Sequence, residues 1–159
     1  MHTLGEPTPT RIIAEGFSTG ASIHEATGHC VHIAFNCHNL KTVAELIRKA
    51  HPDTDLVIAA DDDWKTEGNP GISKGADAAR SVKAKLAIPN WPENQRGKKD
   101  TDFNDLALSH GPAHIMTCIG RAARPLEEKM PKEDRQTVLN RLSEMDQIEY
   151  DLIRVAKAK

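Results

Sequence analysis

The chain of 159 residues has no apolar run that approaches the roughly 20 residues of a membrane-spanning helix. Its first residues, MHTLGEPTPT, lack both the basic start and the apolar core of a secretory signal. The first absence leaves a membrane role without support, and the second predicts a protein that stays in the reducing cytoplasm. The length suits one ordinary domain with an appendage.

Cysteine is scarce, with three residues, and an odd number in a reducing compartment does not indicate a disulfide framework. Five possible zinc ligands nevertheless fall close together: His29, Cys30, His32, Cys37 and His38. Zinc ligands usually come as short pairs such as C-x₂-C, and a strand through Cys30 and His32 would separate these side chains. We favour buried thiols and ordinary histidines over a zinc site.

No excess of positive charge is present, since the formal net charge is −2. Affinity for a phosphate backbone comes largely from Lys and Arg, so the total charge is not typical of a DNA-binding protein. Basic residues do surround the acidic groups of the middle region, among them Lys65, Lys74, Lys98 and Lys99. They form either a basic rim for nucleic acid or nucleotide, or an ordinary solvated face.

Hydrophobic patterns predict strands that alternate with helices. We expect strands at 11–14, 31–35, 55–60 and 86–88. Helices are expected between them, starting near Ser18/Thr19, at Asn39 and near residue 72, and an exposed loop is expected at 90–102. This alternation is typical of an α/β fold with a mainly parallel four-stranded sheet flanked by helices, which binds ligands outside the carboxyl ends of its strands.

Helical patterns continue after the last strand, over 103–110, 112–123 and 133–158. We therefore divide the chain into a domain at 1–111 and a helical extension or linker at 112–159. The last helical pattern has an apolar stripe of Val138, Leu142, Met145, Leu152 and Val155. The stripe either packs back on the core, which we favour, or meets a neighbouring domain.

Acidic residues follow three of the four predicted strands. Glu15 follows the first strand, Asp61 and Asp63 follow the third, and Asp102 and Asp105 lie in the loop after the fourth. A parallel sheet would bring them to one edge, where carboxylates can hold Mg²⁺ or Mn²⁺ while water and substrate phosphates complete the coordination. Crowding of carboxylates raises proton affinity, so Glu15 is a candidate general acid or base. Any one of these acids alone would more often be a helix cap or a surface charge.

Three segments together carry a family resemblance: Ile12–Gly20, Ile58–Asp63 and Thr101–Asp105. They resemble the Toprim domain of phage- and plasmid-encoded DNA primases, including primase–helicase fusions, over roughly residues 10–111. The resemblance implies a compact, metal-dependent α/β domain. Glu15 matches the acid/base glutamate of the family, Asp61 and Asp63 its metal-binding pair, and Asp102 and Asp105 its third acidic motif, for which Asp100 offers another register.

The resemblance further implies primer synthesis on a single-stranded DNA template from nucleotides, together with a helicase domain or protein as partner. Some family features are missing from the sequence. It shows no zinc-binding segment, no basic N-terminal subdomain and no G-x-x-x-x-G-K-[ST] phosphate loop. The loop from Trp64 to Pro70 is longer than usual, and its Trp64 either stacks on a base or packs over the loop, which we favour.

Three other functions use a similar constellation of acids. A Toprim-type nuclease would cleave phosphodiesters with the same site, and a non-catalytic scaffold would keep only the metal. A phospho-receiver module also gathers acids at strand ends, but it needs an acidic pair after the first strand and a lone acceptor after the third, the reverse of the order of Glu15 and Asp61/Asp63. We therefore favour a primase-type nucleotidyltransferase.

Overall fold

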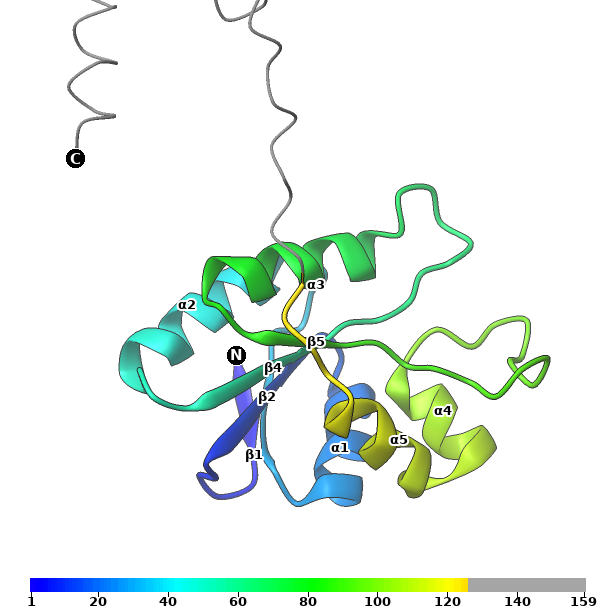
Figure 1. The fold of residues 1–159 in the computed structure, drawn as a ribbon, viewed down its shortest axis with the longest axis horizontal. Helices are drawn as coiled ribbons and strands as arrows, with labels where there is room; N and C mark the ends of the chain where they lie inside the picture. The colour runs from blue at the N-terminus through cyan, green and yellow to red at the C-terminus, as the bar shows by residue number, and fades with distance from the viewer. Residues whose placement is uncertain (126–159) are drawn as a thin grey trace, which may run out of the picture. The chain divides into compact units, whose positions relative to one another are not determined.

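The computed structural model describes residues 1–125, which form a five-stranded sheet with helices on both faces (Figure 1). The strands are β1 (His2–Leu4), β2 (Thr10–Ala14), β3 (Cys30–Ile33), β4 (Asp55–Ala59) and β5 (Lys85–Ala87). Their order in the sheet is β1-β3-β2-β4-β5. Strand β1 is antiparallel to β3, and the other pairs are parallel. The expected α/β fold with a mainly parallel sheet is confirmed.

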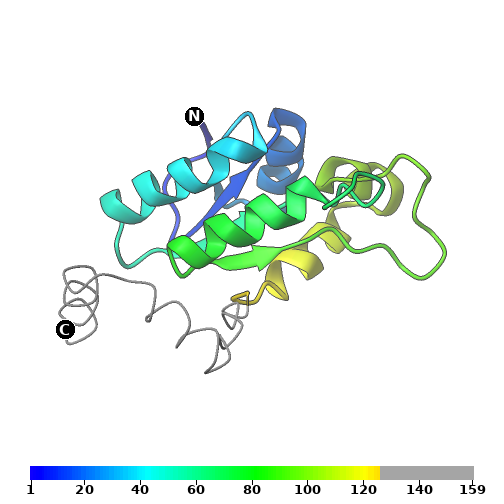
Figure 2. The ribbon, with the colours of Figure 1, turned by 90° about the horizontal axis from the view of Figure 1, so that it is seen from above.

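Helices cover the two faces in separate groups (Figure 2). They are α1 (Phe17–Thr27), the 3₁₀ helix η1 (Cys37–Asn39), α2 (Leu40–Ala50), α3 (Pro70–Ser81), α4 (Phe103–His110) and α5 (Pro112–Gly120). Helices α2 and α3 pack together on one face, whereas α1, α4 and α5 pack on the other. The three-layer arrangement buries both faces of the central strands.

The central strands are apolar on both faces because each face supplies its own core. In β2, Ile12 and Ala14 point to the α1/α4/α5 side, while Ile13 points to the α2/α3 side. In β4, Val57 and Ile58 divide in the same way. Successive side chains of a strand point to opposite faces, so a buried parallel strand reads as a continuous apolar run.

The prediction of four strands was wrong by one, because β1 was missed. This strand has three residues, which are exposed or half-buried, and it lies at the edge of the sheet, where it pairs only with β3. So short an edge strand carries no recognisable alternation of apolar and polar residues.

Helices α1 and α2 begin near the expected positions, but no side chain caps either helix. Helix α1 begins after Gly16 with no side-chain cap, and Ser18 and Thr19 lie inside it. Asn39 occupies the cap position of α2, but its side chain donates to the carbonyl of Ala34 instead of capping. The loop at 90–102 is not wholly exposed, because Trp91 is buried in the core.

Helix α5 belongs to the same core as the sheet, since Ile115, Cys118 and Ile119 pack against residues of β2 and α4. The compact unit that contains the sheet comprises Met1–Leu126, so the boundary expected at 111 falls within it. The helix and apolar stripe expected over 133–158 lie outside the described residues. No helix within residues 1–125 is long and apolar enough to cross a membrane.

Candidate metal-binding edge of the sheet

The carboxyl ends of β2 and β4 bring two acidic segments to the same level. Parallel pairing aligns Ala14 with Ala59, so Glu15 lies one residue beyond this level and Asp61 two residues beyond it. The third acidic segment joins them because the amide of Asp62 donates to the carbonyl of Thr101 at 2.7 Å. Residues 61–69 and 88–102 project as two loops at this edge (Figure 1). We call this region the acidic edge, formed by Glu15, Asp61, Asp63, Asp102 and Asp105.

Asp61 is the most perturbed acid of the acidic edge. Its Oδ1 atom is buried and has no hydrogen-bond partner among the described residues. Burial, followed by the negative charges of Asp102, Glu15, Asp63 and Asp105, raises the pKa of Asp61 from the ordinary value of 3.8 to about 8. A buried carboxylate oxygen without a donor costs free energy unless a proton or a cation neutralises it.

Glu15 lies at the end of β2, with η1 beside it. Burial raises the pKa of Glu15, the backbone amide of Cys37 lowers it, and the negative charge of Asp63 raises it again. The net direction is upward. The thiol of Cys37 is half-buried next to Glu15, and burial together with the charge of Glu15 raises its pKa. A glutamate with raised proton affinity at a ligand-binding edge is suited to proton transfer.

Asp63 is held by the start of helix α3. Its Oδ2 atom accepts a hydrogen bond from the amide of Gly71 at 3.0 Å. Gly71 has to be glycine, because a Cβ atom there would collide with the backbone oxygen of Asp61 and lie 3.1 Å from Oδ2 of Asp63. The positive end of a helix dipole favours a nearby carboxylate, so the start of α3 is a favourable position for the Asp63 side chain.

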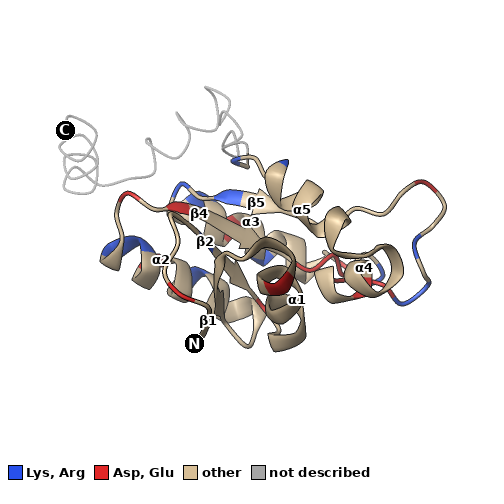
Figure 3. Cartoon of the chain, turned by 90° about the horizontal axis from the view of Figure 1, so that it is seen from below, with Lys and Arg blue, Asp and Glu red and all other residues tan. Residues whose placement is uncertain are grey.

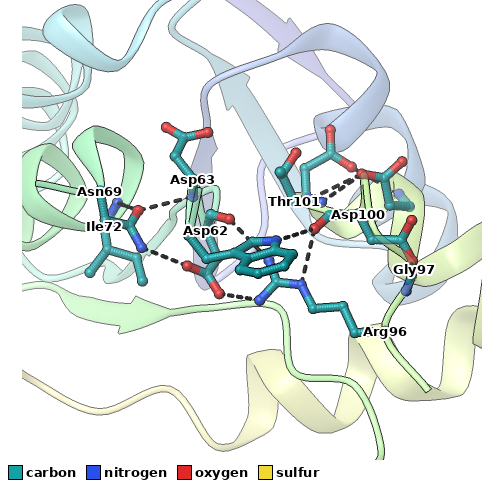
Figure 4. Close-up of polar contacts among 11 residues, drawn as sticks. Asp62, Asp63, Asn69, Ile72, Arg96, Gly97, Asp100 and Thr101 are labelled. Atoms are coloured by element: carbon teal, nitrogen blue, oxygen red, sulfur yellow. Dashed lines mark hydrogen bonds and ion pairs between the residues drawn. The ribbon is translucent and has the colours of Figure 1, made fainter. Parts of the chain in front are cut away.

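Asn69 joins the acidic run to α3 (Figure 4). Its Oδ1 atom accepts from the amide of Asp63 at 2.9 Å and from the amide of Ile72 at 3.4 Å, and its Nδ2 atom donates to Asp62 at 2.6 Å. Asn69 has a positive φ of 41° and caps α3 ahead of Pro70. Sequence reasoning took this segment as loop only. An Asn immediately before Pro-Gly at a helix start is the signal that could have identified the cap.

Asp102 and Asp105 form the capping box of helix α4. Oδ1 of Asp102 accepts from the amide of Asp105 at 2.8 Å, and Oδ2 of Asp105 accepts from the amide of Asp102 at 3.4 Å and from that of Thr101 at 2.8 Å. Oδ2 of Asp102 accepts from the buried hydroxyl of Thr19 at 2.9 Å. Both acids therefore have structural partners, while the charge of Asp102 still reaches Asp61.

Arg96 connects the two loops of the acidic edge (Figure 4). Its guanidinium pairs with Oδ2 of Asp62 at 2.6 Å and donates to the carbonyls of Asp62 and Asp100, both at 3.0 Å. Its Cζ atom lies 5.1 Å from the ring centre of Trp64 and 4.4 Å from that of Trp91. Sequence reasoning missed this role, because no local pattern pairs residues 34 positions apart. Asp62 is thus a structural anchor for Arg96.

Trp64 packs over the loop, as the favoured interpretation held. Its Nε1–H donates to the carbonyl of Asp100 at 3.2 Å, and Lys65 Nζ lies 4.8 Å from its ring centre. The candidate phosphate-binding lysines are all exposed. Lys65 lies beside Trp64, Lys74 lies in the first half of α3, and Lys98 and Lys99 lie in the loop before α4. Figure 3 shows basic and acidic segments along the loop that projects beside α4.

The donor set of the acidic edge fits a hard cation. Within residues 1–125, no three His, Cys, Asp or Glu side chains are grouped so that they could hold a metal ion by themselves. Mg²⁺ does not require such a group, because it keeps several waters and is commonly bound by one or two carboxylates. The partnerless oxygen of Asp61, with Asp63 two residues away, meets that requirement.

Two other features lie away from the acidic edge. A cavity of about 600 Å³ at the amino ends of β4 and β5 is lined by Arg48, Asp55 and Lys85 and contains none of the predicted site residues. In the core, Cys30 Sγ lies 3.8 Å from Nε2 of His32. Burial, followed by positive charge nearby, lowers the pKa of His32 to about 4, so this imidazole is neutral.

The sequence of the chain is similar to those of known proteins. The family model described as Toprim domain matches residues 10–113. Two proteins named DNA primase TraC, both from Escherichia coli, are 42% and 40% identical to this chain over 85 residues. The aligned region is 51% of this chain but only 8% and 6% of those two relatives, so the chain spans a small part of their length.

Proposed function

The chain belongs to the Toprim domain family, and from this membership we propose that its acidic edge binds Mg²⁺ or Mn²⁺ and catalyses nucleotidyl transfer, making RNA primers on single-stranded DNA. The observation that carries the proposal is the buried Oδ1 atom of Asp61, which has no hydrogen-bond partner within the described residues and lies among like charges. The similarity to the TraC primases supports a role with DNA and nucleotides.

Each acid has a distinct role in this proposal. Asp61 and Asp63 hold the cation, which would stabilise the charge that develops on the transferred phosphoryl group. Asp102 and Asp105 complete the negative field of the site and fix the start of α4 against α1. Because the carboxylates of these two acids are engaged in the capping box of α4, we propose them as secondary ligands of the cation, after Asp61 and Asp63.

Glu15 is proposed as the general acid or base. Its raised proton affinity suits it to take a proton from an attacking 3′-hydroxyl, or to give one to a leaving oxygen. Lys65, Lys74, Lys98 and Lys99 are exposed along the same edge and are proposed to contact phosphates of template or nucleotide. A helicase domain or protein is the proposed partner in primer synthesis.

The proposal is tested first by metal titration of the full chain. Calorimetry with Mg²⁺ and Mn²⁺ is expected to show binding in the wild type and in Glu15→Gln, and none in Asp61→Asn/Asp63→Asn. Asp53→Asn is the matched control, because Asp53 is an exposed acid at the opposite edge of the sheet. Undiminished binding in the double variant would refute the metal site.

Activity is then measured on single-stranded DNA with ribonucleotides and Mg²⁺. We expect a template-dependent dinucleotide from the wild type and none from Glu15→Gln, although that variant still binds metal. Cleavage of the template without any dinucleotide would instead indicate the nuclease that shares this site. Metal binding without either reaction would indicate a non-catalytic scaffold.

A further inference from the structure

Exposed aromatic side chains gather at the acidic edge. The chain has five Phe and Trp residues, all within the described part. Trp91 and Phe103 are buried, but Phe17, Phe35 and Trp64 are 52%, 59% and 46% exposed. Each exposed ring lies just past the carboxyl end of a strand. Phe17 is two residues after Glu15, Phe35 is two residues after β3, and Trp64 is one residue after Asp63. Aromatic side chains bury large apolar areas when packed, so their exposure beside a candidate site needs a physical reason.

Trp64 already has a structural role in the described part, since Arg96 and Lys65 lie near its ring and its N–H is bonded. Phe17 and Phe35 differ. Phe17 makes one ring contact, with His2, whose ring centre is 6.0 Å away. Phe35 makes no aromatic or cation–π contact among residues 1–125.

The backbone holds Phe35 beside Glu15 in a conformation that bulky residues avoid. The amide of Phe35 donates to the carbonyl of Glu15 at 2.8 Å, in continuation of the pairing between Ala14 and Ile33. The φ angle of Phe35 is 65°, in the left-handed region. Strained residues of this kind tend to persist at functional sites. Phe17 is the first residue of α1, two residues after Glu15, so one phenylalanine lies near the proposed acid/base residue along the chain and the other is bonded to it through the backbone.

Three other exposed apolar residues do not share this placement. Leu46, Leu108 and Met116 lie on three different helices, α2, α4 and α5. The chain as a whole has a net charge of −2, so attraction of phosphate by charge is confined to the proposed cation and the nearby lysines. An interaction with the base would add to this attraction. Stacking of bases on aromatic rings supplies one, and it tolerates any sequence because every base has a π-face.

We propose that Phe17 and Phe35 form a stacking platform for the base of a nucleotide whose phosphate group lies at the acidic edge. This inference rests on the proposed function, which places nucleotide chemistry there, and it adds how the base is held. The base belongs either to a single strand or to a free nucleotide, and both present the same π-face.

The test measures how much the bases contribute to binding. A fluorescein-labelled thymidine oligonucleotide and an abasic oligonucleotide of equal length are titrated with the full chain by anisotropy, at saturating Mg²⁺. We expect the wild type to prefer the oligonucleotide with bases by about tenfold, a value within the range of base–aromatic stacking. Phe17→Leu/Phe35→Leu is expected to lose this preference, whereas Phe35→Trp retains it. Leu46→Ala, which changes an equally exposed apolar residue on α2, is the matched control.

The outcomes separate this inference from the proposed function. Competition with Mg²⁺–ATP in the wild type assigns the base to a free nucleotide if ATP displaces the oligonucleotide, and to a strand if it does not. An unchanged preference in the double Phe variant, or no preference in the wild type, overturns the stacking platform. The Phe variants are expected to bind Mg²⁺ as the wild type does and to keep its circular dichroism spectrum. Loss of the metal site is detected independently, by the Asp61→Asn/Asp63→Asn titration.

Discussion

Replacing Asp61 by asparagine is expected to stabilise the metal-free chain at neutral pH. The pKa of Asp61 is about 8 in the folded chain, against an ordinary value of 3.8. Between these values the folded state holds a proton that the unfolded state has released, so the free energy of unfolding falls as pH rises through this window. Asparagine has a similar shape and does not ionise, so the free energy of unfolding of the variant does not fall with pH for this reason.

The size of the effect follows from the shift. One pKa unit corresponds to about 1.4 kcal/mol, so the loss accumulated up to pH 7 is on the order of 4 kcal/mol. The difference in stability between Asp61→Asn and the wild type should therefore be near zero at pH 4 and grow steadily toward pH 8. Burial contributes most of the shift and Asp102 is the largest of the nearby charges.

The measurement is urea unfolding followed by tryptophan fluorescence, from pH 4 to pH 8.5, in the presence of a chelator. Asp53→Asn, at the opposite edge, is expected to show no such pH dependence relative to the wild type. Added Mg²⁺ at 100 times its Kd should stabilise the wild type by about 2.7 kcal/mol and leave Asp61→Asn unchanged. A stability difference that is constant with pH, or a variant less stable than the wild type at pH 7, would refute the reasoning that Asp61 is desolvated among like charges.

Three further substitutions probe the supports of the site. Gly71→Ala places a Cβ atom against the backbone of Asp61, so we expect a loss of about 1–3 kcal/mol in urea unfolding and weaker Mg²⁺ binding by calorimetry. Arg96→Lys keeps the charge but loses the planar guanidinium that lies near two indole rings, so we expect the tryptophan emission to shift to the red. If geometry matters more than charge, Arg96→Gln should give a red shift of the same size. Thr19→Val removes the hydroxyl bonded to Asp102 and should cost about 1–3 kcal/mol, whereas Thr19→Ser should restore most of it; equal stability of the two variants would contradict this.

Much of the fold was readable because buried parallel strands have strong patterns. The runs at 11–14 and 55–60 became β2 and β4, and the run at 86–88 overlaps β5. The failures have local causes. Strand β1 is too short and too exposed to show a pattern, and the polar composition of 90–102 does not reveal that Trp91 is buried in the core.

The sequence by itself determined that acids follow the strands, because element order and strand direction are encoded in local hydrophobic periodicity. It also carried the Toprim resemblance, which the family match confirms. Only the tertiary structure decided which side chains these acids meet. The bond between Thr19 and Asp102 spans 83 positions and the pair of Arg96 with Asp62 spans 34, and no local pattern specifies such partners. The burial that leaves an oxygen of Asp61 without a partner likewise arises only when three distant loops pack together.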